Sequence, residues 1–297
     1  MKTIFLATRR DVEEFEPVLY HNKKILPVPI ENIRIGVTRD GFELFYNNMN
    51  LLESDYIFFY PRRKYRDIFY TIARIAEQFV ETSIKSDVLY MVLNKFLLLS
   101  FLQKNGIETV NVFSIAKGDI ARELAKRLRA KLVIQKLAGS EIKIKSPKHL
   151  SDLIHFLKPG HVLFLKEIKW KKSVRCFALR GDVISYDIEN GKPKYRAPSS
   201  EEKEICKRVL KAIGVDYCFL SLVKEGKKTL VEDVSLAGNV EAFVKITGRD
   251  PREMIAKMLE ERGKPAFRGE SFFKLIRSFM RWVEDEIGNI RSATSRI

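Results

Sequence analysis

Short apolar runs dominate the first sixty residues of the chain, which is the pattern of strands rather than helices. Residues 2–7 (KTIFLA) and 55–60 (DYIFFY) are apolar runs, the second closed by a proline. Between them, residues 32–37 (NIRIGV) and 41–46 (GFELFY) flank an Asp-Gly turn, a dipeptide that favours a tight hairpin. This segment therefore predicts two buried strands and a β-hairpin.

After these strands the apolar spacing becomes that of a helix over residues 65–81. Its predicted apolar stripe consists of Ile68, Ile72, Ile75, Ala76 and Phe79. Ser86 as N-cap and Gly106 at the C-terminal end bound a second predicted helix over residues 87–105. We interpret residues 1–85 as a small α/β domain.

A second domain, of α+β type, is predicted over residues 86–170. A short strand (TVNVF) precedes a helix over 118–128, and 131–146 predict two strands around a small-residue turn. A proline opens a helix over 147–157, and 161–168 (HVLFLKEI) predict another strand.

A third domain is predicted over residues 171–264, where two β-hairpins, 173–188 and 217–234, turn at Arg-Gly-Asp and Glu-Gly. A helix lies between them, with a capping box at Ser199 or Ser200 and a terminal glycine. Two short helices follow the second hairpin.

Residues 265–297 form a C-terminal extension that predicts one amphipathic helix over 271–287. The strands and helices together give a fold of mixed α/β and α+β class. The aromatic residues of the extension pack inward or form a contact surface, so an oligomer formed through this helix is an open alternative.

Composition narrows the class of protein. No apolar run approaches the roughly 18 residues of a membrane span, and the N-terminus is charged too early for a secretion signal. Three cysteines lack metal-site spacing and are expected to be reduced and buried; they are Cys176, Cys206 and Cys218. These features favour a cytoplasmic protein without a membrane partner.

The net charge of +16 favours an anionic partner, which is a nucleotide, a nucleic acid or an acidic substrate. The densest basic clusters are residues 62–66 (RRKYR) and 169–175 (KWKKSVR). A surface charge that only maintains solubility is the alternative.

Several motifs stand at defined places in this order of elements. Lys95 follows Asn94 in NKFLLLSFLQKNG, and a second lysine stands in LVIQKLAGSEI before small residues. The strand VLFLKEI ends on Lys-Glu-Ile, and the hairpin SVRCFALRGDVISYD carries Arg175. The last hairpin pairs YCFLSL with LVEDVS, where two carboxylates are adjacent.

With these motifs in this order, residues 30–260 resemble the ATP-grasp fold, in particular a divergent member of its RimK-like carboxylate–amine ligase branch. The resemblance implies a small α/β pre-domain before the two ATP-grasp lobes. The departures are clear: Asn94 replaces the Asp of an Asp-Lys pair, and Ser173 replaces the Asp of an Asp-x-Arg motif. The glycine-rich loop has become Glu-Ile-Lys-Ile beyond its first small residues.

The resemblance implies ATP as cofactor. Fixed lysines offset phosphate charge, and a small-residue turn lets backbone N–H groups approach the phosphates. The implied phosphate contacts are Lys95, Lys136, Gly139 and Ser140, and the implied adenine contacts are Lys166, Glu167 and Ile168. Taken singly, each of these lysines is also consistent with an exposed surface lysine.

The resemblance implies that the adjacent carboxylates correspond to the Mg²⁺ site of that family. In the family an Asp, a Glu and an Asn on the last hairpin hold the metal. Here the corresponding residues are Ser221, Asp233 and Ser235. Asp233 is expected to face the nucleotide, with Glu232 on the opposite face or substituting through a slip in register. A solvated strand end is the alternative interpretation of both acids.

On the substrate side, Arg175 is expected to stabilise an acyl phosphate and Arg196 to face an acidic substrate. Three hypotheses remain open. The first is an ATP-dependent ligase that forms an amide or peptide bond from a carboxylate and an amine through an acyl phosphate, with a small acidic or amino-acid-bearing substrate. The second is a catalytically degenerate ATP-grasp scaffold that binds a nucleotide or a nucleic acid. The third, compatible with both, is a subunit that pairs through its C-terminal helix.

Overall fold

A computed structural model of the chain describes these residues: 2–20, 22–39, 41–115, 131–135, 141–143, 146, 148, 163–168 and 172–261. The helices predicted over 118–128 and 271–287, and all but Lys148 of the one over 147–157, lie outside them. No helix in the described part of the chain is long and apolar enough to cross a membrane. The four-domain division of the sequence stays a prediction.

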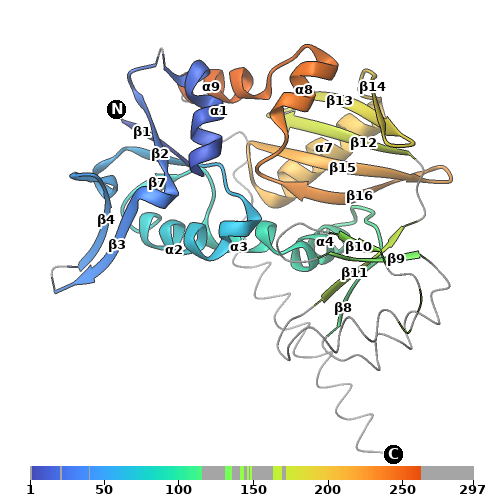
Figure 1. The fold of residues 1–297 in the computed structure, drawn as a ribbon, viewed down its shortest axis with the longest axis horizontal. Coiled ribbons are helices and arrows are strands. Elements are labelled where there is room, and N and C mark those ends of the chain that lie inside the picture. The colour runs from blue at the N-terminus through green and yellow to red at the C-terminus, as the bar shows by residue number, and fades with distance from the viewer. Residues whose placement is uncertain are drawn as a thin grey trace, which may run out of the picture.

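The N-terminal part of the chain forms a parallel sheet in the strand order β2-β1-β6-β7 (Figure 1). Its strands are β1 (Thr3–Ala7), β2 (Ile25–Pro29), β6 (Tyr56–Phe59) and β7 (Glu81–Thr82). All five positions of β1 are buried because it is a central strand, covered on both faces. The apolar runs at residues 2–7 and 55–60 were both predicted to be strands, and this is confirmed. The two strands are also neighbours in the sheet.

Helix α1 (Arg9–Leu19) and strand β2 escaped prediction from the sequence. The Thr8 side chain accepts a hydrogen bond from the Asp11 N–H and so begins α1, although Pro17 lies inside the helix. Strand β2 contains two prolines, which argue against a strand, but it lies at the edge of the sheet, where a missing N–H is tolerated.

The predicted hairpin is confirmed as β3 (Ile33–Thr38) and β4 (Gly41–Tyr46), followed by β5 (Met49–Asn50). Short 3₁₀ turns are present as η1 (Ile30–Asn32), η2 (Leu51–Glu53) and η3 (Arg63–Tyr65).

Helix α2 (Arg66–Ala76) ends five residues earlier than its apolar stripe predicted. Ile68 and Phe79 are 42% and 57% exposed, so the predicted stripe is wrong at both ends. The chain leaves the helix at Glu77, whose carboxylate accepts hydrogen bonds from the Ser86 N–H and hydroxyl at 2.9 and 2.8 Å. These bonds satisfy the N-terminus of the next helix and fix where α2 ends.

The single helix predicted over 87–105 is also wrong, because two helices, α3 (Ser86–Leu93) and α4 (Lys95–Lys104), meet at Asn94. Asn94 has extended backbone angles (φ −107°, ψ 102°), and its side chain accepts a hydrogen bond from the Leu97 N–H at 3.3 Å. Asn94 thus acts as an N-cap that restarts the helix, and Lys95 becomes the first residue of α4. The apolar periodicity continues across the break and conceals it.

The next sheet has the order β10-β9-β11-β8 and is antiparallel. Its strands are β8 (Val112–Ile115), β9 (Lys131–Gln135), β10 (Glu141–Lys143) and β11 (Leu163–Ile168). Before β8, residues 108–110 run along β16: the Val110 N–H donates to the Val231 carbonyl at 3.0 Å, and the Val231 N–H donates to the Glu108 carbonyl at 2.9 Å. The segment that leads from α4 to β8 is therefore hydrogen-bonded to the edge strand β16.

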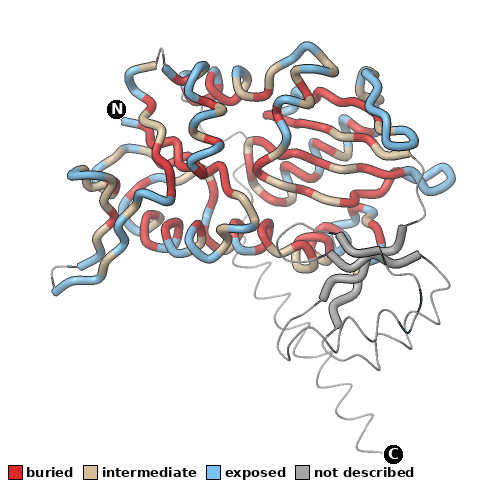
Figure 2. Tube along the Cα trace, viewed as in Figure 1, coloured by how far each residue is buried: buried red, intermediate tan, exposed pale blue. Residues whose placement is uncertain are grey.

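A five-stranded antiparallel sheet, in the order β14-β13-β12-β15-β16, carries both predicted hairpins. Its strands are β12 (Lys172–Leu179), β13 (Asp182–Glu189), β14 (Lys192–Tyr195), β15 (Tyr217–Glu225) and β16 (Lys228–Ser235). Every residue of the edge strand β14 is exposed. Figure 2 shows that the buried residues are concentrated in the inner strands of this sheet and of the N-terminal sheet.

Three helices pack around this sheet: α7 (Ser200–Ile213), α8 (Val240–Thr247) and α9 (Pro251–Glu261). The predicted capping box is confirmed at the N-terminus of α7, between Ser199 and Glu202. Helix α8 places Phe243 against the ring of Phe219, with ring centroids 5.9 Å apart. Helices α3 and α4 contact β16, the edge strand at the opposite side of the sheet from β14 (Figure 1).

The end of β6 is joined to the β15–β16 hairpin by two buried tyrosines. The Tyr217 hydroxyl lies 3.0 Å from the Phe59 carbonyl and 2.8 Å from the Leu236 carbonyl, and can donate to either. The Tyr60 hydroxyl accepts a hydrogen bond from the Gly238 N–H at 3.1 Å, and the two tyrosine rings stack 6.2 Å apart. This junction fixes the backbone that follows β6 beside the end of β16.

We expect the protein to lose stability as the pH rises above about 10. Burial raises the pKa of the Tyr60 phenol, and raises that of the Tyr217 phenol well above the ordinary value of 10.0. The unfolded chain releases these protons at its ordinary pKa and the folded chain does not. The stabilisation is therefore complete below that pKa and is lost as the pH rises above it.

Urea unfolding between about pH 8 and pH 11 checks this expectation. Tyr217→Phe should flatten the alkaline decline and lower the free energy of unfolding at neutral pH by about 1 kcal/mol, because a buried hydrogen bond is lost. An alkaline decline that is the same in the variant would contradict the assignment to Tyr217.

Gly238→Ala is expected to lower the free energy of unfolding by about 1–3 kcal/mol. A β-carbon at position 238 would lie 2.3 Å from Cδ1 of the buried Phe219 ring, so the junction must shift. Gly36→Ala is the matched control, since its β-carbon would meet the flexible Glu43 carboxylate at 3.3 Å. Chemical denaturation of both variants measures the difference, and equal effects would count against the steric argument.

Candidate functional site

Three sequence-predicted residues lie in one row across the five-stranded sheet. Arg175 on β12 is paired with Ser221 on β15, which is in turn paired with Asp233 on β16. Ser235 lies two residues further along β16, opposite Phe219. Directly paired residues of an antiparallel sheet project from the same face, so these side chains share one face.

A β-bulge interrupts β16 at the two adjacent carboxylates. Ser221 is paired with Asp233, but the next residue of β15, Leu222, is paired with Val231, which leaves Glu232 as an extra residue. The bulge breaks the strict alternation that predicts opposite faces for the two acids. The Glu232 carboxylate accepts a hydrogen bond from Nη1 of Arg175 at 3.2 Å, so this acid reaches a member of the Asp233 row.

Asp233 is the centre of the site. Arg63 in η3 donates two parallel hydrogen bonds to its carboxylate, from Nη1 at 2.9 Å and from Nη2 at 2.7 Å. Nη2 of Arg63 also donates to the Val234 carbonyl at 2.6 Å. Nζ of Lys95, a buried side chain, lies 3.6 Å from Oδ2 of Asp233. Residues from three distant segments therefore meet at one carboxylate.

The Asp233 cluster is the name we give to Arg63, Lys95, Arg175, Glu232 and Asp233. Three of its side chains are positive and two are negative, which leaves one positive charge in excess. Burial lowers the pKa of the Arg63 guanidinium. The charge and the hydrogen bonds of Asp233 raise that pKa by more than burial lowers it, so the net change is an increase. Asp233 thus keeps Arg63 charged, and the positive excess of the cluster favours an anion beside it.

A cavity of about 200 Å³ lies on the same face as the Asp233 cluster. Aromatic rings of Tyr186, Phe219 and Phe243 provide apolar walls, and polar groups come from the Asp233 row. The remaining lining residues are Arg175, Cys176, Leu220, Ser221, Asp233, Ser235, Ala237, Gly238 and Asn239. Apolar walls with a few convergent polar groups are typical of a small-molecule site.

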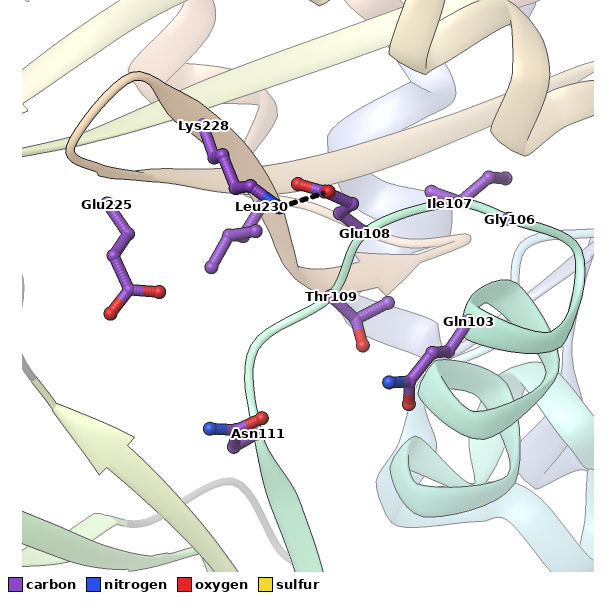
Figure 3. Close-up of a pocket in the computed structure, with 9 residues that line it drawn as sticks. All are labelled: Gln103, Gly106, Ile107, Glu108, Thr109, Asn111, Glu225, Lys228 and Leu230. Carbon is purple, nitrogen blue, oxygen red and sulfur yellow. Dashed lines mark hydrogen bonds and ion pairs between the residues drawn. The ribbon is translucent and has the colours of Figure 1, made fainter.

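Two further cavities, of about 280 and 320 Å³, flank the segment that pairs with β16. Figure 3 shows the first of them, where Nζ of Lys228 lies 2.7 Å from Oε1 of Glu108. Because these two charges neutralise each other at the surface, we place the candidate site at the cavity beside Asp233.

Three of the four predicted Mg²⁺ ligands, Asp233, Glu232 and Ser235, contact other groups of the chain through their side-chain oxygens. Both Asp233 oxygens accept hydrogen bonds from Arg63, and Glu232 is paired with Arg175. The Ser235 hydroxyl donates to the Ala237 carbonyl at 2.7 Å. Within the described residues, no three His, Cys, Asp or Glu side chains cluster in a way that could hold a metal ion. The donor set therefore does not fit a divalent cation held by the protein.

Arg196 donates hydrogen bonds to other groups of the chain. Its Nε donates to Asp187 at 2.9 Å, its Nη2 donates to the buried Glu202 at 2.6 Å, and its Nη1 donates to the Ala197 carbonyl at 2.8 Å. Lys172 also lies 2.9 Å from Asp187. Arg196 therefore contacts the capping box of α7 in this structure, and its role toward an acidic substrate stays a prediction.

The structure describes only some of the remaining predicted nucleotide contacts. Lys136, Gly139 and Ser140 lie outside the described residues. Lys166, Glu167 and Ile168 end β11, and their backbones pair with residues 131–133 of β9. Their adenine-binding role stays a prediction.

Sequence reasoning missed Arg63. It belongs to the basic cluster RRKYR, which was noted in the sequence only for its positive charge, yet all three of its arginines are ion-paired within the protein. Arg62 donates from Nε to both oxygens of the buried Asp11, at 3.1 and 3.0 Å, and Arg63 holds Asp233. The sequence did contain one signal for Arg63: the cluster directly follows a buried strand, and functional residues often lie at strand ends.

Comparison with known proteins gives the fold. No protein-family model matches the chain. The chain is 24% identical over 189 residues to a probable alpha-L-glutamate ligase of Haemophilus influenzae (strain PittEE), a match that covers 56% of this chain and 63% of that protein. The corresponding protein of strain 86-028NP is 24% identical, with 56% and 62% covered. The match thus spans less than two thirds of the length of these relatives.

Solved structures match over most of the chain. The ATP-grasp ligase PsnB complexed with a minimal precursor has a TM-score of 0.68 at 12% identity, covering 89% of this chain and 99% of PsnB. The macrocyclase MdnC from Microcystis aeruginosa MRC, bound with the precursor peptide MdnA, has a TM-score of 0.66 at 10% identity, covering 88% and 100%.

An ATP-grasp RimK domain protein from Sphaerobacter thermophilus DSM 20745 has a TM-score of 0.66 at 12% identity, covering 86% of this chain and 98% of that one. Identities this low speak for the fold and leave the reaction open. The chain has the ATP-grasp fold, and the resemblance to RimK-like ligases that its sequence indicated is confirmed.

Proposed function

We propose that the chain is an ATP-dependent ligase that joins a carboxylate to an amine through an acyl phosphate. The observation that carries this proposal is the Asp233 cluster, whose excess positive charge lies beside a cavity on the ATP-grasp sheet. A polyphosphate is the anion that best fits several fixed cations at one place. The names of the relatives, which are ligases, support the same class of reaction.

The reaction needs positioning and charge more than a side-chain nucleophile. The substrate carboxylate attacks the γ-phosphorus of ATP and releases ADP; the amine then attacks the acyl carbon and releases inorganic phosphate and a proton. We assign to Lys95 and Lys136 the role of offsetting the phosphate charge, and to Arg175 that of stabilising the acyl phosphate. Because the described carboxylates are paired with arginines, any Mg²⁺ would be carried by the phosphate oxygens.

We infer the substrate class from the names of the relatives and of the similar structures. An amino acid or a peptide supplies both the carboxylate and the amine that the reaction needs. Glutamate and precursor peptides appear in the names of the relatives and in the titles of similar structures, and we extend this class to the present chain as part of the proposal.

A second function is a nucleotide-binding ATP-grasp module without turnover. The observation that favours it is the pairing of both candidate metal-binding acids with arginines, together with serines at positions 221 and 235. A nucleic-acid surface is less well supported, because Arg62 and Arg63 of the densest basic cluster are engaged within the protein. Pairing through the C-terminal helix stays a prediction.

We expect Lys95→Ala to weaken ATP binding by about tenfold or more, which corresponds to the loss of one charge-assisted contact. Isothermal titration calorimetry of wild type and variant measures the effect. Lys104→Ala removes the same charge from the exposed end of the same helix and should leave the affinity unchanged. A similar loss in both variants would indicate a general charge effect, and no ATP binding by wild type would rule out the proposal.

Phosphate release separates the two candidate functions. The ligase should release inorganic phosphate from ATP only when a carboxylate substrate and an amine are both present, and mass spectrometry should detect the amide product. Pools of acidic amino acids and of short peptides are the substrates to try first. ATP binding without phosphate release under all of these conditions would favour the binding module.

A further inference from the structure

Arg63 occupies the place beside Asp233 where a carboxylate-bound metal ion would carry its charge. Its guanidinium makes two parallel hydrogen bonds to the carboxylate at 2.9 and 2.7 Å, and a third bond of 2.6 Å to the Val234 carbonyl. The forked geometry uses both Asp233 oxygens at once. A divalent cation would have to displace the guanidinium before it could bind there.

The position of Arg63 is fixed by the fold rather than by its side chain alone. The preceding residues are held where the Tyr217 hydroxyl lies 3.0 Å from the Phe59 carbonyl and where the Tyr60 hydroxyl accepts a hydrogen bond from the Gly238 N–H. The side chains of Arg63 and Asp233 are only 22% and 23% exposed. Breaking this pair would leave one poorly hydrated charge without its partner, so exchange for a metal ion is disfavoured.

The other oxygen donors near Asp233 do not favour a metal ion either. Glu232, brought to this side by the bulge, is paired with Arg175, and Nζ of Lys95 lies 3.6 Å from Asp233. Ser221 and Ser235 supply neutral hydroxyls, which are weak ligands for hard cations compared with carboxylates. Every described acid of the site therefore faces a cation that belongs to the chain.

We propose that Arg63 is a built-in replacement for a protein-held divalent cation, so that the chain binds a nucleoside triphosphate through its own guanidinium and ammonium groups. The nucleotide part of this inference rests on the proposed function. The metal part rests on the Arg63–Asp233 geometry alone and is tested without nucleotide. A consequence is that nucleotide affinity does not depend on a metal ion bound by Asp233 or Glu232.

Manganese binding to the nucleotide-free protein is the first test. Mn²⁺ alone is titrated into the full chain at neutral pH, and free Mn²⁺ is followed by electron paramagnetic resonance. Wild type should bind Mn²⁺ only weakly, and Arg63→Gln, which removes the guanidinium from Asp233 while keeping much of the side-chain bulk, should bind it about tenfold more tightly. Arg63→Lys keeps the positive charge and should remain as weak as wild type.

Arg66→Ala is the matched control, because it removes the same charge from the same segment but from a residue paired with Asp67. It should leave Mn²⁺ binding unchanged. Tight Mn²⁺ binding by wild type that is not increased in Arg63→Gln would overturn the inference. Circular dichroism establishes that each variant is folded, and Arg63→Lys decides the question if Arg63→Gln does not fold, since tight Mn²⁺ binding by Arg63→Lys contradicts it.

ATP binding to wild type in Mg²⁺ and in EDTA is the second test. The two affinities should agree within about threefold, a difference of less than 1 kcal/mol. A loss of more than about tenfold in EDTA would overturn the inference while leaving the proposed function intact. No ATP binding in either buffer would rule out the proposed function, whereas the Mn²⁺ titration would still decide the role of Arg63.

Discussion

The forked ion pair between Arg63 and Asp233 connects segments 170 residues apart, and the geometry of the site depends on it. It brings the turn after β6 of the N-terminal parallel sheet against β16, an edge strand of the five-stranded sheet. Lys95 shares the same carboxylate from the start of a helix, so three separate elements are aligned by one acid. A half-buried pair of this kind specifies position as well as contributing energy, because either charge alone would be poorly solvated.

The pairing also explains how the chain differs from the general chemistry of its fold. An acid that accepts hydrogen bonds from a guanidinium keeps its negative charge while its oxygens are already occupied. The bulge at Glu232 extends the same arrangement to a second acid, which meets Arg175. Together they form an alternating set of charges with a small positive excess, which suits a phosphate group better than a bare metal ion.

Local patterns predicted the local parts of this structure. All three predicted hairpins and the capping box at Ser199 follow from short-range turn and cap chemistry, and the structure confirms them. The helix break at Asn94 escaped because apolar residues continue on both sides of it, so periodicity carries no mark of the break. The bulge at Glu232 depends on the register of the partner strand, which one strand's sequence does not contain.

The approach of Arg63 to Asp233 escaped for a related reason. A basic cluster predicts charge but does not say which distant acid lies within reach, and only the packing of the two sheets decides it. Lys95 and Asp233 were named together through the resemblance to a family, not through periodicity or spacing. Long-range contacts between charged residues are thus where reasoning from the residues alone ended.

The strand that carries Asp233 lies at the margin of its sheet, and margins of this kind invite association with other chains. Residues 108–110 cover the middle of that margin through two backbone hydrogen bonds to Val231. The opposite margin, β14, is protected differently, because its exposed sequence Lys-Pro-Lys-Tyr combines charge with a residue that lacks an N–H. The two margins thus oppose edge-to-edge pairing by different means, backbone cover at β16 and charge together with proline at β14.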